Sequence, residues 1–461
     1  MSSRVLTTWN PEDKDFWEKE GKAIATRNLW ISIPALFLAF SVWMVWSVVV
    51  VNMQTIGFKY DSDKLFWLAA LPGLTGATLR IFYSFMVPIF GGRKWTTIST
   101  ASLLIPAVGI GLAVRNPETS YSTMLVLALL CGFGGGNFAS SMANISFFFP
   151  KAQKGTALGL NAGLGNLGVS AMQFLVPLVI TTGMFSALCG DPQMCVINGV
   201  TKPLWLQNAG FVWVPFIMAS TIAAWFGMND IASARASFSE QAVIFKRKHN
   251  WIMCWLYLGT FGSFIGYSAG LPLLIKSQFP GMNPTKYAFL GPLVGALVRP
   301  VGGWLADKLG GAVVTFWNFI VMAAAVFGVL AFLPHSGTGG NFWGFLAMFI
   351  LLFFTTGIGN GSTFRMIPVI FLTERQRDAS GKGTEAQEKA LRDASKEAAA
   401  VLGFSSAFAA YGAFFIPKSF GTSITMTGGP DAALYGFIIF YVSCIATTWW
   451  FYARKNSEMP C

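Results

Sequence analysis

Twelve long apolar runs divide this sequence of 461 residues. Most of them reach the roughly 20 residues that a helix needs to cross the hydrocarbon core of a bilayer. In chain order the runs lie near 28–53, 65–90, 96–114, 122–149, 156–185, 209–228, 251–275, 287–306, 312–333, 342–371, 399–424 and 432–453. Inside lipid a segment must satisfy its own backbone hydrogen bonds, and a helix does so alone. The sequence therefore predicts an all-α membrane protein with twelve transmembrane helices.

The composition agrees with membrane insertion and excludes several other classes of protein. Hydrophobic residues make up 54% of the chain and charged residues only 11%, whereas soluble domains carry roughly 25% charge. These values exclude a disordered chain, a disulfide scaffold and a nucleic-acid-binding domain, despite the net charge of +12. In membrane proteins a basic excess collects in cytoplasmic loops. The expected partner is therefore the lipid bilayer, and no nucleic acid is expected.

Polar segments divide the chain into two halves of six runs each. The halves are 28–228 and 251–453, and the segment 229–250 joins them. A polar N-terminal segment, 1–27, and a short tail, 454–461, flank the halves. Most of the 32 Lys and Arg residues fall on the side of the membrane that these three polar segments share. By the positive-inside rule, both termini and the central segment are expected in the cytoplasm.

The two halves carry a repeated pattern of small residues and arginine. Residues of the second run recur in the eighth at one constant spacing: Gly76, Ala77, Arg80, Gly91 and Gly92 match Gly295, Ala296, Arg299, Gly310 and Gly311. The fourth and tenth runs also share a G-x-G-x-G pattern. Two pseudo-symmetric six-helix halves, with a substrate site at the membrane midplane, are typical of the major facilitator fold.

Two of the repeated residues, Arg80 and Arg299, lie deep in their runs. Arg80 precedes the next polar loop by about ten residues, which places it roughly 15 Å into the membrane. A charge at that depth costs about 2.5–3.5 kcal/mol on insertion scales, so it faces a cavity or the bundle interior. No Asp or Glu lies deep in any run, and a guanidinium fork matches a planar oxyanion. The two arginines therefore predict an anion-binding site.

Several stretches resemble known transporter families. The stretch GGWLADKLGG, with Asp307, resembles a loop motif of the major facilitator superfamily, whereas Pro88 stands at the acidic position in the first half. More specifically, four stretches resemble nitrate/nitrite porters of the NarK type: GNFASSMANISFFFPK (136–151), GLNAGLGNLGVS (159–170), TFGSFIGYSAG (260–270) and LGFSSAFAAYGAFFIPK (402–418).

The resemblance implies a secondary transporter that takes up nitrate and exports nitrite by alternating access. It places the chain in the inner membrane of a bacterium, in nitrate assimilation, with a functional link to a nitrate reductase that faces the cytoplasm. We expect a monomer without enzymatic activity, cofactor or metal ion. Asp307 is expected to take part in the conformational change.

Four aromatic residues and one amide are candidates to line the anion site. Tyr257 and Phe261 are four residues apart and share a helix face, while Phe138 and Phe364 occupy near-repeat positions. By residue type alone they fit ordinary packing, because the chain has 43 Phe. In the porter family the matching positions line the nitrate site. Asn166 lies in mid-helix, where an amide needs a partner; an inter-helix bond is one reading, and by family position it donates to the anion.

Glycines in the fifth and eleventh runs are candidates for gating. GLGNLG contains Gly163, Gly165 and Gly168 and matches the dinucleotide pattern G-x-G-x-x-G, but no strand precedes it and no acidic residue follows. Small residues instead let helices approach or slide past one another. Gly403 and Gly412 are the candidates in the eleventh run.

Three further features leave alternatives open. Cys189 and Cys195 share one polar loop, and they form either a disulfide in an oxidising compartment or two free thiols. Arg365 either extends toward the membrane surface or belongs to a gate. The segment 373–397 has dense mixed charge and is expected to be a solvated helix.

Other functions compete with nitrate/nitrite exchange. Proton symport normally needs an intramembrane Asp, Glu or His. The best substitute in these runs is Tyr257, and a phenol is a poor proton carrier because it ordinarily ionises only far above neutral pH. An anion channel is disfavoured by the repeat. A quinone oxidoreductase would need haem ligands in helices, whereas His249 and His335 both lie in loops.

Overall fold

The computed structural model describes the chain except residues 1–3, 184–189, 198–199, 233, 235–242 and 335–338. Within these described residues, twelve helices are long and apolar enough to cross a membrane. Their bounds are Lys14–Ile56, Ser62–Tyr83, Gly92–Ala113, Tyr121–Phe148, Lys151–Val179, Asn208–Gly227, Lys248–Gln278, Pro284–Leu309, Gly311–Phe332, Phe342–Ala379, Glu397–Thr427 and Asp431–Ala453. Each corresponds to one apolar run, so the prediction of a twelve-helix all-α membrane protein is confirmed.

Contacts divide the chain into two compact units that do not coincide with the two sequence halves. Unit 1 comprises Met1–Arg235, Tyr267–Leu293 and Ala413–Thr425. Unit 2 comprises Ala236–Gly266, Val294–Gly412 and Met426–Cys461. Unit 1 thus holds most of the first half together with two pieces of the second.

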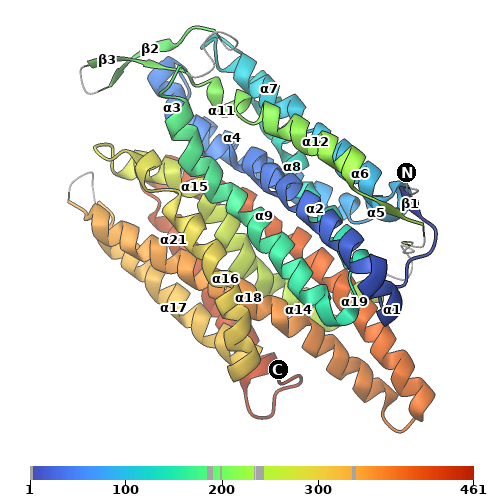
Figure 1. Cartoon of the computed structure of the whole chain (residues 1–461). Coiled ribbons are helices and arrows are strands. Elements are labelled where there is room, and N and C mark those ends of the chain that lie inside the picture. Colours follow the sequence, from blue (N-terminus) through green and yellow to red (C-terminus); the bar gives the residue numbers. More distant parts are fainter. Residues whose placement is uncertain (1–3, 184–189, 198–199, 233, 235–242, 335–338) are drawn as a thin grey trace. The chain divides into compact units, whose positions relative to one another are not determined.

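Unit 1 is built mainly from the helices of the first half, which are coloured from blue to green in Figure 1. They are α1 (Lys14–Phe16), η1 (Trp17–Gly21), α2 (Lys22–Met44), α3 (Trp46–Met53), η2 (Gln54–Ile56), α4 (Ser62–Tyr83), α5 (Met86–Phe90), α6 (Gly92–Ala101), α7 (Leu104–Ala113), α8 (Tyr121–Phe148), α9 (Lys151–Val179), α11 (Asn208–Phe211) and α12 (Val214–Gly227). The short helix η5 (Pro284–Lys286) belongs to it as well.

Unit 2 contains the remaining helices. They are η3 (Val243–Lys246), α14 (Lys248–Tyr257), η4 (Leu258–Gly262), α17 (Gly311–Phe332), α18 (Phe342–Ala379), α19 (Thr384–Ala410), α21 (Asp431–Thr448) and η6 (Trp449–Ala453). Three helices cross the boundary between the units: α15 (Ser263–Gln278), α16 (Leu290–Leu309) and α20 (Gly412–Thr427).

Glycines bring α4 and α8 into backbone contact inside unit 1. A Cβ added at Gly132 would stand 2.0 Å from Oγ1 of Thr75, and one at Gly135 would stand 2.6 Å from Cα of Gly76. Either side chain would push the helices apart, because small residues are what lets helix backbones approach in a membrane bundle. Part of the G-x-G-x-G run of the first half therefore serves this packing.

The N-terminal segment folds onto unit 1. Strand β1 (Val5–Leu6) pairs in parallel with β4 (Asp230–Ile231). The indole Nε1 of Trp9 donates to the carbonyl of Phe147 at 3.0 Å, and the Glu12 carboxylate accepts from the backbone N–H of Lys151 at 2.9 Å. That last contact caps the first turn of α9 with a negative charge, which favours the helix.

Polar insertions contain regular structure that the apolar pattern does not predict. Strands β2 (Gln193–Ile197) and β3 (Val200–Leu204) form an antiparallel pair in unit 1. In unit 2, α18 extends to Ala379 and α19 begins at Thr384, so most of 373–397 is helical as expected. Its Ala, Glu and Lys residues are good helix formers, and Gly381 and Gly383, with φ of 79° and 87°, form the turn between the helices.

Candidate anion-binding site

Arg80 lies fully buried in unit 1, on α4. Its Nε donates to the carbonyl of Gly135 on α8 at 2.9 Å. The guanidinium carbon lies 4.8 Å from the ring centroid of Phe138 and 5.3 Å from that of Trp43. These distances are in the range of cation–π attraction. The Arg80 guanidinium thus contacts the backbone and the Phe138 ring of α8 and the Trp43 ring of α2.

Arg299 lies partly buried in unit 2, on α16. Its Nη2 donates to the hydroxyl of Tyr257 at 3.3 Å, and its guanidinium carbon lies 5.3 Å from the ring centroid of Phe364. Its Nη1 is buried and has no hydrogen-bond partner among the described residues. A buried donor without a partner carries a desolvation cost of about 1–3 kcal/mol, more for a charged group, which an anion would relieve.

Aromatic rings complete the surroundings of Arg299. Tyr257 and Phe261 stack with ring centroids 5.6 Å apart and an interplanar angle of 18°. Phe364 lies 6.4 Å from Tyr257. The structure thus brings Arg299, Tyr257, Phe261 and Phe364 together in unit 2, and Arg80 with Phe138 in unit 1. In both units a phenylalanine from a neighbouring helix faces the arginine, as the near-repeat positions suggest.

Asn166 is buried on α9 of unit 1, with 1% of its surface exposed. Its Oδ1 has no hydrogen-bond partner among the described residues, and no inter-helix bond of this side chain is present there. A buried amide without partners is costly. The Oδ1 of Asn166 is thus unsatisfied, and no hydrogen bond joins this side chain to Arg80 in the described part of unit 1.

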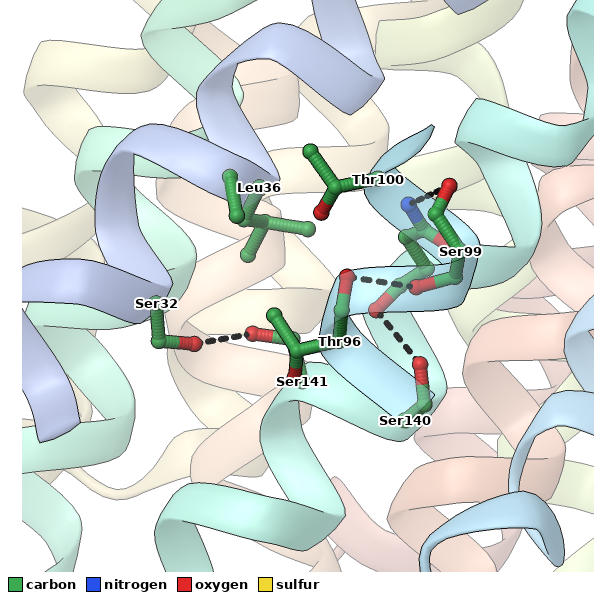
Figure 2. Close-up of a pocket in the computed structure, with 9 residues that line it drawn as sticks. Ser32, Leu36, Thr96, Ser99, Thr100, Ser140 and Ser141 are labelled. Carbon is green, nitrogen blue, oxygen red and sulfur yellow. Dashed lines mark hydrogen bonds between the residues drawn. The ribbon is translucent and has the colours of Figure 1, made fainter. Parts of the chain in front are cut away.

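A small polar pocket that the sequence did not predict lies in unit 1 (Figure 2). Its volume of about 10 Å³ admits at most one water molecule. Asn137 donates from Nδ2 to the carbonyl of Ser99 at 3.4 Å, while its Oδ1 and the Thr100 hydroxyl have no partner among the described residues. The lining is Ser32, Ala35, Leu36, Thr96, Ser99, Thr100, Asn137, Ser140 and Ser141. The only sequence signal is a scatter of Ser and Thr in apolar runs.

The five candidate gating glycines differ in how much space surrounds them. A Cβ added at Gly168 would stand 2.1 Å from the carbonyl oxygen of Phe37, and one at Gly412 would stand 2.3 Å from that of Gly262. At Gly165 it would meet the side chain of Leu36 at 2.7 Å. At Gly163 and Gly403 it would meet nothing within 4 Å.

This difference leads to a matched prediction of stability. We expect Gly168→Ala and Gly412→Ala to lower the free energy of unfolding by about 1–3 kcal/mol, because the new methyl group meets backbone atoms. Gly163→Ala and Gly403→Ala, the controls, should be neutral or stabilising by up to about 1 kcal/mol, because alanine favours helix. Heating detergent-purified protein and measuring the folded fraction checks both; equal losses in all four variants would contradict the packing argument.

Each unit contains an arginine–aspartate pair next to the repeated Gly-Gly. In unit 2, Asp307 pairs with Arg365 of α18, and the two side chains are 54% and 50% exposed. Arg365 therefore contacts the loop motif itself. In unit 1, Arg93 pairs with Asp230, whose carboxylate accepts from the Arg93 backbone N–H at 2.8 Å and from its Nε at 3.2 Å. Both of those side chains are 8% exposed.

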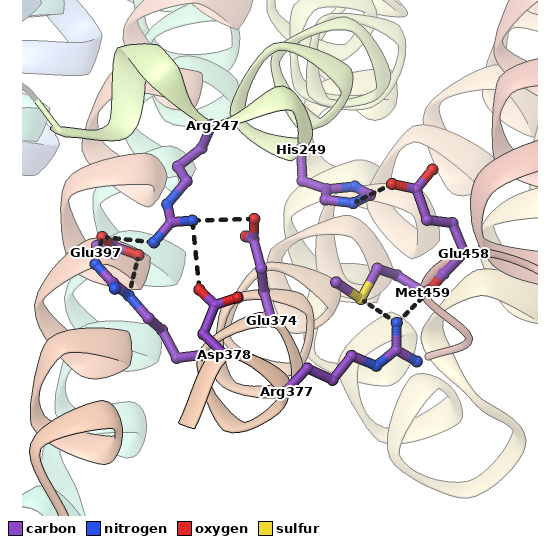
Figure 3. A network of polar contacts seen from close by, with 9 residues as sticks. Arg247, His249, Glu374, Arg377, Asp378, Glu397, Glu458 and Met459 are labelled. Carbon is purple, nitrogen blue, oxygen red and sulfur yellow. Dashed lines mark hydrogen bonds and ion pairs between the residues drawn. The ribbon is translucent and has the colours of Figure 1, made fainter. Parts of the chain in front are cut away.

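A network of ion pairs joins the segment 373–397 to the central segment within unit 2 (Figure 3). The guanidinium of Arg247 contacts Glu374 at 3.3 Å, Glu397 at 3.4 Å and Asp378 at 3.8 Å. Arg375 also bonds Glu397, whose side chain is only 5% exposed. The segment 373–397 is therefore not a simple solvated helix, because part of its charge is buried against the central segment.

The tail 454–461 joins the same end of unit 2 (Figure 3). The Glu458 carboxylate lies 2.7 Å from Nζ of Lys248 and 3.5 Å from Nε2 of His249. His249 is buried in the first turn of α14, so the prediction that it lies in a loop is wrong, and His335 lies outside the described residues. The hydrogen bond from Lys248 holds the pKa of the Glu458 carboxyl below its usual range. The carbonyl of Cys461 accepts from the backbone N–H of Ala312 at 2.9 Å. The tail is thus held against the first turns of α14 and α17.

The loop cysteines are only partly described. Cys195 lies buried in β2, and its thiol donates to the carbonyl of Lys202 at 3.3 Å. Burial raises the pKa of the Cys195 thiol, which makes it less reactive. Cys189 lies outside the described residues, so its pairing with Cys195 stays a prediction.

Comparisons with known proteins identify the family. Residues 35–384 match the model of the Major Facilitator Superfamily. The chain is 53% identical to the nitrate/nitrite transporter NarU of Escherichia coli over 460 residues, which cover 99% of this chain and 97% of that protein. It is 44% identical to the probable nitrate/nitrite antiporter NarK2 of Thermus thermophilus, over 99% of this chain and 98% of that protein.

A solved structure supports the fold. The nucleoside transporter NupG (D323A mutant) matches with a TM-score of 0.61 over 91% of this chain and 98% of that chain, at 10% sequence identity. Such a likeness shows a shared fold and nothing about substrate. Together with the sequence matches, it shows that the chain belongs to the Major Facilitator Superfamily and, within it, to the NarK-type nitrate/nitrite transporters, a family of multi-pass membrane carriers and not of enzymes.

Proposed function

We propose that this protein exchanges external nitrate for internal nitrite across the inner membrane of a bacterium. The names of its relatives support the two substrates. The observation that carries the proposal is the arginine environment: Arg80 and Arg299, at repeat positions, each face a phenylalanine ring at 4.8 and 5.3 Å. A fixed guanidinium suits a planar oxyanion through its bidentate fork, and aromatic walls exclude larger hydrated ions.

Each candidate residue has a distinct role in this proposal. Arg80 and Arg299 supply positive charge, while Asn166 and Tyr257 supply hydrogen bonds to the anion. The rings of Phe138, Phe261 and Phe364 form the walls. Gly163, Gly165, Gly168, Gly403, Gly412 and Asp307 serve the conformational change. The close contacts at Gly168 and Gly412 and the Asp307–Arg365 pair support a role in helix packing during that change.

Alternating access then requires the two sequence halves, 28–228 and 251–453, to move against each other around the bound anion. We place both termini and the segment 229–250 in the cytoplasm on the distribution of Lys and Arg. In this orientation a monomer delivers nitrate to a reductase on the cytoplasmic side and removes the nitrite formed there. The loop with Cys189 and Cys195 lies on the opposite side, where a disulfide would persist.

In this proposal the charges at the site couple nitrate uptake to nitrite export. Arg80 and Arg299 give the site a fixed positive charge, because a guanidinium is a permanent cation in proteins. Without an anion these uncompensated positive charges oppose the conformational change, and a bound anion neutralises part of that charge. Each half-cycle then carries one anion, so exchange moves no net charge.

Proteoliposomes test this coupling. With internal nitrite and external labelled nitrate, uptake should depend on the internal anion and change little when a pH gradient is imposed. The control is the same vesicle without internal anion, in which uptake should be near background. Accumulation driven by the gradient alone in anion-free vesicles would show nitrate/proton symport instead, and a current without exchange would show a channel.

A further inference from the structure

At the end of unit 1 remote from its N-terminal segment, the first turns of α4 pack closely against residues 413–425. We call this contact the seam. Helix α4 starts at that end, because the helix Lys14–Ile56 ends there. A Cβ added at Gly73 of α4 would stand 2.4 Å from the carbonyl carbon of Ala413, and one at Gly421 would stand 2.6 Å from Cβ of Phe66. The stretch from Phe66 to Gly73 thus packs against 413–425 with no space for a side chain at the glycines.

A cavity of about 280 Å³ adjoins the seam. Leu65 of α4 lines the cavity, and the next residue, Phe66, belongs to the seam. The whole lining comes from unit 1 and comprises Gln54, Ser62, Leu65, Leu273, Lys276, Ser277 and Pro280. The cavity therefore lies between the seam and the loops that connect α3 to α4 and α15 to η5.

The chemistry of the lining favours an anion. Lys276 is its one charged residue, and none of the seven lining residues is acidic. Nζ of Lys276 donates to the carbonyl of Val51 at 2.5 Å, and an ammonium has three donors, so two remain for a ligand. The hydroxyl of Ser62 and the second N–H of the Gln54 amide, whose first donates to the Tyr60 carbonyl at 2.8 Å, add neutral donors. The Ser277 hydroxyl donates to the Leu274 carbonyl at 3.0 Å and so adds none.

The carboxylates near the cavity are engaged by other groups. The carboxylate of Asp63 is paired with Nζ of Lys418 at 2.7 Å, so its charge is compensated. The carboxylate of Asp61 caps α4 by accepting from the Lys64 backbone N–H at 2.8 Å, so its charge faces the partial positive charge of the helix N-terminus. Low-dielectric walls with one sign of charge raise the local concentration of the opposite ion.

We infer that this cavity is an anion recruitment site, in which Lys276 holds a small oxyanion against the closed seam before the transport pathway opens. The inference rests on the proposed function for the identity of the anion, nitrate or nitrite. A purely structural role for Lys276 would be to tie α15 to the last carbonyls of α3, as lysines near helix C-termini do. The two roles predict different effects of a Lys276 substitution on the KM for nitrate.

The test is the variant Lys276→Gln in oriented vesicles loaded with nitrite. Glutamine retains an N–H donor for the Val51 carbonyl and removes only the charge. We expect the KM for nitrate presented at the face of this cavity to rise about tenfold, while kcat stays within about twofold. The KM measured at the opposite face should not change, and Lys276→Arg, which keeps the charge, should restore a KM near that of the unmodified protein.

Lys286→Gln is the matched control, because Lys286 is exposed on η5 of unit 1 and does not line the cavity. It should leave both KM values unchanged. An unchanged KM in Lys276→Gln, or an equal change at both faces, would overturn the recruitment site while leaving exchange intact. Absence of nitrate uptake by the unmodified protein would overturn the proposed function and this inference together.

Discussion

Replacing Arg80 or Arg299 by lysine should weaken nitrate binding by about tenfold to a hundredfold, although the charge is retained. Charge-assisted hydrogen bonds contribute roughly 1.5–3 kcal/mol each, and a factor of ten corresponds to about 1.4 kcal/mol. An ammonium is a point charge without the bidentate fork. In Arg80→Lys the planar group that donates to the Gly135 carbonyl and lies 4.8 and 5.3 Å from the Phe138 and Trp43 rings is also lost.

Equilibrium binding of labelled nitrate to purified protein checks this prediction separately from transport. Arg115→Lys is the control, because Arg115 is exposed in a loop and should bind nitrate normally after the same substitution. Size-exclusion chromatography establishes that each variant is folded. Affinity near that of the unmodified protein in either arginine variant would refute a clamp made of both arginines.

The apolar runs predict the membrane helices well because the bilayer imposes one length and one solvent on all of them. The resemblance to the porter family and the near-repeat position of Phe364 predict the surroundings of Arg299, since Tyr257 and Phe364 both contact it in unit 2. The roles of these residues in binding stay predictions.

The structural features that the sequence did not predict depend on contacts between segments that are distant in the chain. Strand β1 exists because residues near 230 offer it a partner. Glu397 is buried because Arg247, from the central segment, reaches it. The polar pocket around Asn137 and Thr100 combines residues of α2, α6 and α8. No periodicity within one segment reports such pairings, so the sequence could not predict them.

The carboxylate next to the Gly91-Gly92 turn of unit 1 is another feature that the sequence could not predict. The sequence places Pro88 where the second half has Asp307, so the first copy looks as if it has no carboxylate. In the structure Asp230, from beyond the sixth membrane helix, takes its place beside Gly91 and Arg93. A Cβ added at Gly91 would stand 2.4 Å from Oδ1 of Asp230, and the φ of +89° at Gly91 favours glycine as well.

The two carboxylates should therefore differ sharply in their contribution to stability. Asp230→Asn should lower the free energy of unfolding by about 3–5 kcal/mol, because it leaves the buried Arg93 guanidinium without its counter-charge. Asp307→Asn should cost only about 0–1 kcal/mol, because its pair with Arg365 is half-exposed and screened by water. The folded fraction of heated, detergent-purified protein compares the two, and the exposed pair is the control for the loss of one negative charge.

A second substitution separates the charge effect from simple disruption of the turn. Arg93 also donates from Nη1 to the Trp225 carbonyl at 3.2 Å, and its guanidinium carbon lies 4.6 Å from the Trp225 ring, so Arg93→Gln alone should be destabilising. If the penalty of Asp230→Asn comes from an unpaired buried charge, adding Arg93→Gln should recover part of it, because the double variant buries no lone ion. Additive losses, or equal small losses for Asp230→Asn and Asp307→Asn, would show that an unpaired buried charge is not what destabilises Asp230→Asn.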